Sequence, residues 1–115
     1  MILSTTETVP GMEITEGLGL VSGSTVRARV FLRDIFAGFK NILGGEVSTY
    51  TRMLEEAREQ AVVRMIEAAE EKGADAVVCM RFSTSAIMRN AAEVVAYGTA
   101  VKLKNAQSPN APRPQ

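Results

Sequence analysis

The chain has 115 residues, and its 13 Lys and Arg residues balance 13 Asp and Glu residues to give a formal net charge of zero. This length predicts a single domain, and the charge balance argues against a nucleic-acid-binding protein that relies on a basic surface. There is no histidine and only one cysteine, which excludes a Ser-His-Asp triad, a His-containing zinc site and a disulfide within the chain. Because no long apolar run or signal peptide is visible, we expect a cytoplasmic protein that does not contact a membrane.

Two β-rich stretches open the chain. The first, over residues 1–6, ends before the turn signal Pro10-Gly11. The second, over residues 12–30, alternates with a period of two, and its glycines at 17, 19 and 23 are typical of a bend or a β-bulge. These glycines superficially resemble a dinucleotide-binding turn, but they lead into more strand instead of a helix, so we expect no Rossmann site.

A short helix and a long helix are predicted next. Apolar residues on one face predict the short helix over residues 35–43, with Asp34 as N-cap and Gly44-Gly45 as its stop. The long helix is predicted from Ser48 to Lys72, with Gly73 in the C′ position. Its apolar stripe comprises Leu54, Ala57, Ala61, Val62, Met65, Ala68 and Ala69, and its charged face comprises Arg52, Glu55, Glu56, Glu59, Glu67, Glu70 and Glu71.

Two further strands, over residues 74–82 and 93–103, close the domain, and the connection between them is short enough to favour antiparallel pairing. We expect one domain over residues 1–104 and a disordered, proline-rich tail over residues 105–115. The order β-β-α-α-β-β predicts an α+β fold in which the long helix covers one face of an antiparallel sheet. Because the last strand is apolar on both faces, we expect a second subunit to cover the other face.

Polar residues on the strands and near the helix starts are the candidate ligand-binding residues. Three arginines expected to project from the sheet either pair with Glu93 or receive an anionic ligand at a subunit junction, and ion pairing is favoured. The whole candidate set is Arg27, Arg29, Glu46, Tyr50, Arg58, Arg81, Glu93 and Tyr97.

Cys79 lies on a predicted buried strand, with Val77 and Arg81 expected on the same face. A neighbouring arginine favours a reactive thiolate, but a free cysteine more often serves as a small buried apolar residue, which is the interpretation we favour. No pair of a nucleophile and a base is visible, so we expect no enzymatic activity.

Several short motifs follow one another in a characteristic order: Ile2-Leu3-Ser4-Thr5-Thr6, Pro10-Gly11, Leu18-Gly19-Leu20-Val21-Ser22-Gly23, Gly44-Gly45-Glu46 followed by Tyr50, Glu56-Ala57-Arg58, Gly73-Ala74-Asp75-Ala76-Val77-Val78, and Glu93-Val94-Val95-Ala96-Tyr97-Gly98-Thr99-Ala100-Val101. From about Ile2 to Leu103, the chain resembles the YbjQ-like proteins, small bacterial and archaeal proteins of unknown function that are often labelled heavy-metal-binding. The resemblance implies a dodecin-like subunit in a homopentameric ring. It supplies no catalytic residues.

Metal binding is poorly supported by the donors present, since the chain has no histidine and one cysteine. The metal hypothesis is kept only because fivefold symmetry would gather five copies of Cys79 or of a carboxylate around one axis. The cofactor is unknown. Our leading hypothesis is a non-enzymatic homopentamer that binds a small ligand or metal ion at its subunit interfaces. The alternative is a scaffolding oligomer that binds a protein partner through its acidic helix. An enzyme using Glu46, Tyr50 or Arg58 ranks last.

Overall fold

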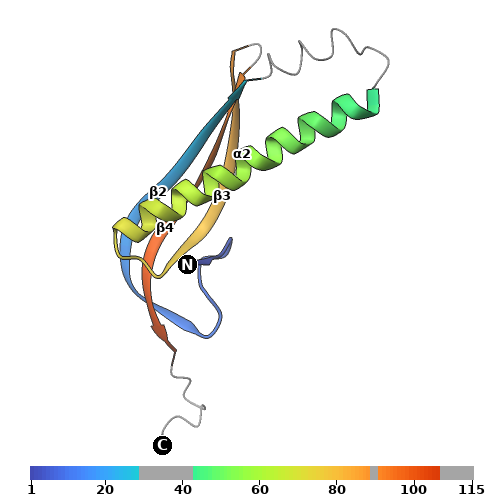
Figure 1. Ribbon diagram of the computed structural model, residues 1–115. Helices are drawn as coiled ribbons and strands as arrows, with labels where there is room; N and C mark the ends of the chain where they lie inside the picture. Colours follow the sequence, from blue (N-terminus) through green and yellow to red (C-terminus); the bar gives the residue numbers. More distant parts are fainter. Residues whose placement is uncertain (29–42, 89–90, 107–115) are drawn as a thin grey trace, which may run out of the picture.

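The computed structural model describes residues 1–28, 43–88 and 91–106. In this part of the chain, one long helix lies across one face of a four-stranded sheet (Figure 1). The elements are β1 (Ile2–Leu3), β2 (Met12–Ala28), α2 (Leu43–Glu71), β3 (Ala76–Met88) and β4 (Ala91–Asn105). The predicted α+β class is confirmed.

The sheet has the strand order β1-β3-β4-β2. The three long strands pair antiparallel, as predicted for the last two. The expectation of a wholly antiparallel sheet is wrong, however, because β1 pairs with β3 in the parallel sense. β3 also continues to Met88, through residues that were predicted to connect two strands, and β4 ends at Asn105, the first residue of the predicted tail. The remainder of that tail, from residue 107, lies outside the described residues.

Helix α2 begins at Leu43, five residues before its predicted start at Ser48. Gly44 and Gly45 lie inside the helix and do not end a shorter one, because neither has the left-handed φ that a C′ glycine needs. Glycine in a helix costs only about 1 kcal/mol relative to alanine, which the remaining turns can offset. Apart from Leu43, the short helix predicted over residues 35–43 lies outside the described residues.

The carboxyl end of α2 follows the prediction. Gly73 has a left-handed φ of 77°, and its N–H donates to the Glu70 carbonyl at 2.9 Å.

 The N–H of Ala74 donates to the Ala69 carbonyl at 3.0 Å, and the two hydrogen bonds together form a Schellman motif. The helix therefore ends where glycine permits a left-handed residue.

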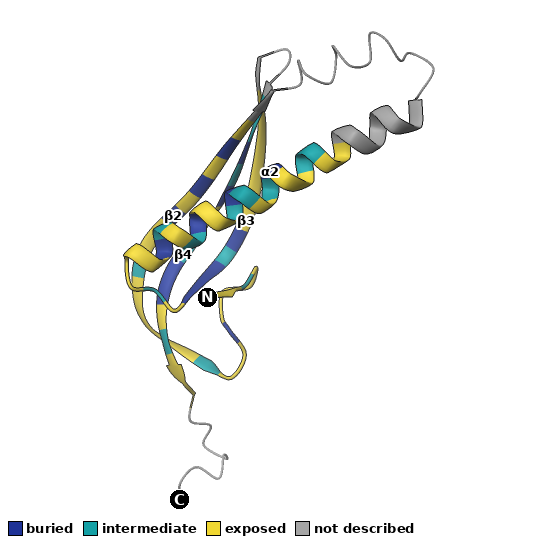
Figure 2. Ribbon diagram, in the orientation of Figure 1, coloured by how far each residue is buried: buried dark blue, intermediate teal, exposed yellow. Residues whose placement is uncertain are grey.

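The core between α2 and the sheet is built from small side chains. The apolar stripe of α2 predicted from the sequence is confirmed from Ala57 to Ala69, whereas Leu54 is half-buried and belongs to neither core cluster. The stripe packs mainly on β2 and β4 (Figure 2). At Gly23 the helix approaches β2 so closely that a Cβ atom would overlap the backbone of Ala61 and Met65. The buried residues of this core are Val21, Ala57, Ala61, Met65, Ala69, Val77, Met80, Val94, Ala96 and Ala100.

The opposite face of the sheet is covered only at one end. The segment after β1 turns at Pro10-Gly11, where the Met12 N–H donates to the Val9 carbonyl at 3.0 Å, so the predicted turn is confirmed. This turn places Val9 against the strands in a second, smaller buried cluster. The other buried members of this cluster are Ala76, Val78 and Val101. Beyond this cluster the sheet face is open, and the described residues supply no second layer.

Replacing Gly23 with alanine tests the close approach of helix and strand. We expect Gly23→Ala to lower the free energy of unfolding by about 1–3 kcal/mol, because the new methyl group meets backbone atoms that can only move with the whole helix. The matched control is Gly17→Ala in the same strand, where a Cβ meets nothing within 4 Å. Urea unfolding followed by circular dichroism measures both, and equal stability of the two variants would contradict the packing described.

Candidate functional site

A β-bulge in the middle of β3 determines on which face of the sheet the following residues of the strand lie. Val78 lies opposite Thr99 and Arg81 lies opposite Tyr97, so Cys79 and Met80 together span the position of one residue on β4. Cys79 has a φ of 55°, in the left-handed region that residues other than glycine rarely adopt. That position on β4 is Gly98, where a Cβ would lie 2.6 Å from Val77 Cγ1 and 2.9 Å from the Val78 carbonyl oxygen. The bulge therefore depends on a glycine in the neighbouring strand.

The bulge reverses the direction of the side chains that follow it. Val77 points toward α2, whereas Arg81 pairs with Tyr97 on the opposite face. The expectation that Val77 and Arg81 share a face is therefore wrong, since one extra residue changes the alternation of the strand. Cys79 is half-buried and does not belong to either buried cluster.

The Ser4-Thr5-Thr6 motif wraps around this bulge. The Ser4 N–H donates to the Val77 carbonyl at 2.9 Å, and the Cys79 N–H donates to the Thr6 carbonyl at 3.0 Å. The Ser4 and Thr6 hydroxyls lie 2.6 Å apart, and Thr6 Oγ1 donates to the Thr8 carbonyl, also at 2.6 Å. The strand predicted over residues 1–6 is therefore wrong beyond Leu3, where β1 ends. The motif's run of three hydroxyl residues was the only signal that local hydrogen bonds replace strand here.

Arg81 is held in place by the same motif. Its Nη1 donates to the Thr5 carbonyl at 2.8 Å and to the Met80 carbonyl at 2.9 Å. On the open face of the sheet, Arg81, Tyr97 and Ser22 are direct cross-strand neighbours on three adjacent strands. We call these three residues the Arg81 row. It combines a guanidinium with two hydroxyl groups, which is a donor-rich arrangement suited to an anion.

Glu93 lies on β4 four residues from Tyr97, which is about 13 Å along a strand. Arg81 is therefore too far from Glu93 for the ion pair that the sequence favoured, and its Nη1 donates to backbone carbonyls instead.

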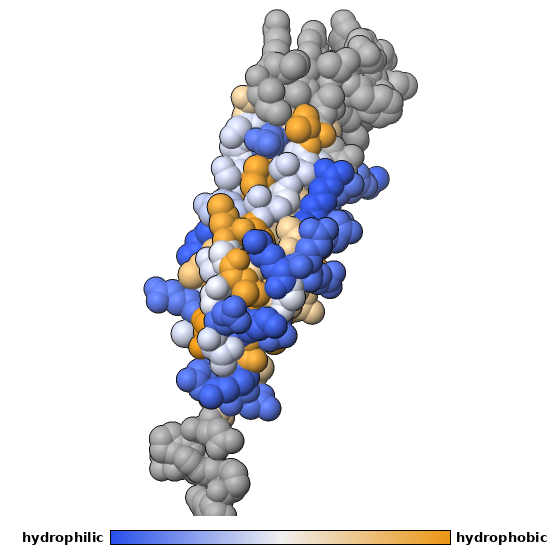
Figure 3. Space-filling view, turned by 90° about the vertical axis from the view of Figure 1, so that its left-hand side faces the viewer, coloured by the Kyte–Doolittle hydropathy of each residue, from blue (hydrophilic) through white to orange (hydrophobic). Residues whose placement is uncertain are grey.

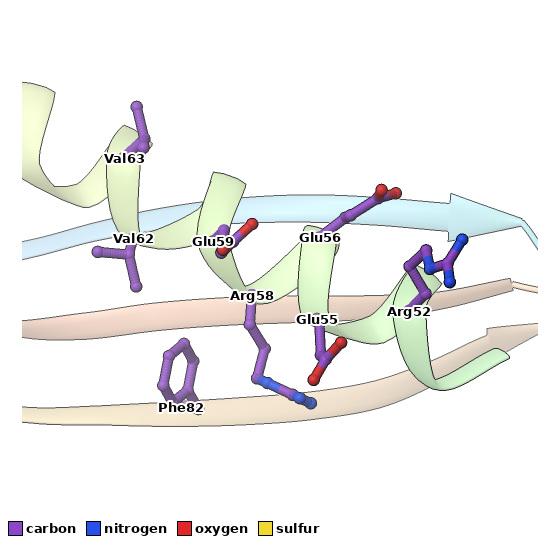
Figure 4. Close-up of a pocket in the computed structure, with 8 residues that line it drawn as sticks. All are labelled: Arg52, Glu55, Glu56, Arg58, Glu59, Val62, Val63 and Phe82. Carbon is purple, nitrogen blue, oxygen red and sulfur yellow. The ribbon is translucent and has the colours of Figure 1, made fainter. Parts of the chain in front are cut away.

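A groove lies on the other side of the sheet, between α2 and β3. It has a volume of about 890 Å³ and is open to solvent. Figure 4 shows Glu55, Arg58 and Val62 pointing from the helix toward the strand that carries Phe82. Phe82 is 45% exposed, so the groove combines an apolar floor with charged walls. Its complete lining is Arg52, Glu55, Glu56, Arg58, Glu59, Val62, Val63 and Phe82.

The remaining candidate residues are spread over the fold. Arg27 lies near the end of β2 opposite Ala92, and Arg29 lies outside the described residues. Glu46 and Tyr50 belong to the first two turns of α2. The structure thus brings Arg81 and Tyr97 together and places Arg58 on the other side of the sheet from them.

Comparison with known proteins assigns the chain to a family. A YbjQ family model, described as "putative heavy-metal-binding", matches residues 1–104. The chain belongs to the YbjQ family. This confirms the resemblance found in the sequence motifs.

Close relatives of this YbjQ protein carry the name UPF0145 protein. One from Psychromonas ingrahamii is 60% identical over 90% of this chain and 99% of its own length. Another, from Methanosarcina acetivorans, is 54% identical over 91% of this chain and 99% of its own length. A crystal structure of a protein of unknown function of the DUF74 family from Pediococcus pentosaceus shares the fold, with a TM-score of 0.51, 14% identity, and coverage of 90% of this chain and 98% of that one.

The family description raises the question of a metal site, and the described side chains of this chain do not fit one. Within residues 1–28, 43–88 and 91–106, no three Cys, Asp or Glu side chains are placed so that they could hold one metal ion, and the chain has no histidine. Soft metal ions need several thiolate or imidazole ligands, which a single half-buried Cys79 does not supply.

In the same described ranges, no helix is long and apolar enough to cross a membrane.

The left-handed backbone at Cys79 gives a stability prediction. We expect Cys79→Val to lower the free energy of unfolding by about 1–2 kcal/mol, because a β-branched side chain disfavours positive φ more strongly. Cys79→Gly should stay within about 1 kcal/mol of the native chain, because glycine adopts this φ without strain. Thermal and urea unfolding measure both variants, and a valine variant at least as stable as the glycine variant would contradict this account.

Proposed function

We propose that this YbjQ protein is a non-enzymatic homo-oligomer that binds a small anionic ligand at the Arg81 row, close to the junction between subunits. The observation that carries the proposal is the position of Arg81, whose guanidinium is fixed by two backbone carbonyls on the open face of the sheet. A guanidinium that is already oriented loses less side-chain entropy when it binds an anion. Tyr97, which is 37% exposed, adds a hydroxyl and an aromatic edge beside it.

The uncovered sheet face supports the oligomer. Leu20 is 70% exposed and Val26 is 57% exposed, and the register of β2 places both on the same face as the Arg81 row. Figure 3, which faces the β2 side of the molecule, shows apolar residues along it beside charged ones. Large exposed apolar residues on a small domain mark an interaction surface. We take the number of subunits, five in a dodecin-like ring, from the family resemblance.

Binding is preferred to catalysis because the Arg81 row pairs no general base with either of its hydroxyl groups. An anionic ligand is preferred to a metal ion because the row offers N–H and O–H donors and no carboxylate. We place the protein in the cytoplasm, where a lone thiol such as Cys79 stays reduced.

Native mass spectrometry of protein released by gentle lysis tests the ligand. We expect an oligomer that carries a reproducible extra mass, which Arg81→Met and Tyr97→Phe each reduce at least several-fold without changing the number of subunits. Arg52→Met, in the groove on the opposite side of the sheet, is the matched control and should keep the extra mass. An oligomer with no extra mass, or one whose extra mass survives both substitutions, would overturn the ligand proposal. A mass equal to a metal ion would replace the anion with a metal.

A second candidate function rests on the groove beside α2, which has an apolar floor and an acidic rim. Glu55, Glu56 and Glu59 are exposed there, next to the half-exposed Phe82. Such a surface suits a protein partner with basic and apolar side chains, in keeping with a scaffolding oligomer that uses its acidic helix.

Charge reversal tests this scaffold function. We expect Glu55→Lys combined with Glu59→Lys to abolish capture of a partner from lysate, whereas the same reversal at Glu67 and Glu70, nearer the carboxyl end of α2, should leave capture intact. Affinity capture followed by mass spectrometry reads both variants. Capture that is unchanged by reversal at Glu55 and Glu59 would remove the groove from consideration.

A further inference from the structure

The open face of the sheet around the Arg81 row has an apolar middle and polar sides. On the central strand β4, Tyr97 and Val95 are two residues apart, so both side chains lie on this face. Val95 lies directly opposite Ser24 on β2 and Ser83 on β3, and both serines are exposed. The row at Val95 therefore repeats the Arg81 row, with an apolar or aromatic side chain in the centre and a polar one on each side.

Tyr97 offers an aromatic platform in the centre of these two rows. The residue is 37% exposed. Among the described residues, none hydrogen-bonds to the Tyr97 hydroxyl, and none stacks an aromatic ring on Tyr97. An exposed aromatic ring on a sheet can stack against a second planar ring, with little dependence on which ring it is.

Polar groups at both edges of this platform favour a heteroaromatic ring over a hydrocarbon one. Because β2 and β3 flank β4, the two columns of polar side chains are about 10 Å apart. A planar ring that lies between them, over Tyr97 and Val95, meets hydroxyl groups at both edges. A hydrocarbon ring would displace water from these hydroxyls and return no hydrogen bond, whereas ring nitrogen and oxygen atoms can pair with them.

Arg81 supplies positive charge at one corner of the platform. Its two hydrogen bonds, to the carbonyls of Thr5 and Met80, both use Nη1. A guanidinium has three further N–H groups, on Nε and Nη2, which suit two-point contact with a phosphate or carboxylate. Since Arg81 and Tyr97 are direct cross-strand neighbours, about 5 Å apart, one small molecule can reach both.

We infer that the ligand of this face joins an anionic group, bound by Arg81, to a planar heteroaromatic ring, stacked on Tyr97, as in a nucleoside monophosphate. The inference rests on the anion site of the proposed function and names the class of ligand. It does not depend on an oligomer, because every side chain that it uses belongs to one chain. Stacking of one base on an aromatic side chain raises affinity by about fivefold to a hundredfold, so the ring adds measurably to what the anionic group contributes.

Calorimetric titration of the full chain with two compounds tests the inference. Adenosine monophosphate carries a base, and ribose phosphate is the same sugar phosphate without it. We expect adenosine monophosphate to bind about fivefold more tightly, or better, to the native chain. Tyr97→Leu should remove this preference, Tyr97→Phe should keep it, and Arg81→Met should weaken both compounds by about tenfold or more. Phe82→Leu, which removes an exposed aromatic ring from the opposite face of the same sheet, is the matched control and should keep the preference.

A second variant reports on the edges of the ring without a change at Tyr97. Ser24→Ala combined with Ser83→Ala should weaken adenosine monophosphate several-fold, because the ring loses hydrogen bonds at both edges, and should leave ribose phosphate unchanged. Circular dichroism before titration checks the fold of each variant, and the comparison of the two compounds on the native chain needs no variant.

The outcomes separate this inference from the proposed function. Equal affinity of the native chain for the two compounds would overturn the stacked ring and leave the anion site standing. A preference that survives Tyr97→Leu, or an adenosine monophosphate affinity unchanged by the two serine substitutions, would do the same. A native chain that binds neither compound would overturn the inference, and the extra mass lost with Arg81→Met then decides the proposed function separately. Binding of both compounds that survives Arg81→Met would overturn the inference and the proposed anion site together.

Discussion

The close contact between α2 and β2 at Gly23 is the constraint on which the rest of this structure depends. Because Gly23 has no side chain, the backbone of α2 from Ala61 to Met65 lies directly against the strand, and the core is a thin layer of small side chains. This single layer of side chains covers only one face of the sheet. The helix covers mainly β2 and β4, and this leaves the outer half of β3 and the far face of the sheet for another surface to cover.

The bulge at Cys79 decides what that far face carries. Without the extra residue, strand alternation would place Arg81 on the same side as Val77, under the helix. The bulge requires a glycine at position 98 and a left-handed residue at position 79, and the backbone of the Ser-Thr-Thr motif binds it from the open side. These three features, far apart in the sequence, together place one fixed guanidinium beside Tyr97 on the open sheet face.

Periodicity predicted the elements that follow one simple repeat. The stripe of α2 from Ala57 to Ala69, the Schellman glycine at 73 and the glycine-bearing strand β2 could all be predicted, because each depends on near neighbours in the chain. The start of α2 was not readable, since glycines at 44 and 45 look locally like a stop, and the length of β3 was not, since pairing with β4 holds residues 83–88 extended. The sequence named Arg81 and Tyr97 as candidates but predicted neither Ser22 nor the row itself, because a single bulge exchanges the two faces of a strand and leaves almost no trace in the sequence.

The central claim is that the open surfaces of this sheet are where copies of the chain meet. Sedimentation equilibrium of the full chain, over a wide range of protein concentration, tests that claim most directly. The account predicts one species with five times the 12.4 kDa subunit mass, unchanged on dilution. A monomer that persists at high concentration would contradict it, because Leu20, Val26 and the edge of β3 would then be exposed to water in the working protein.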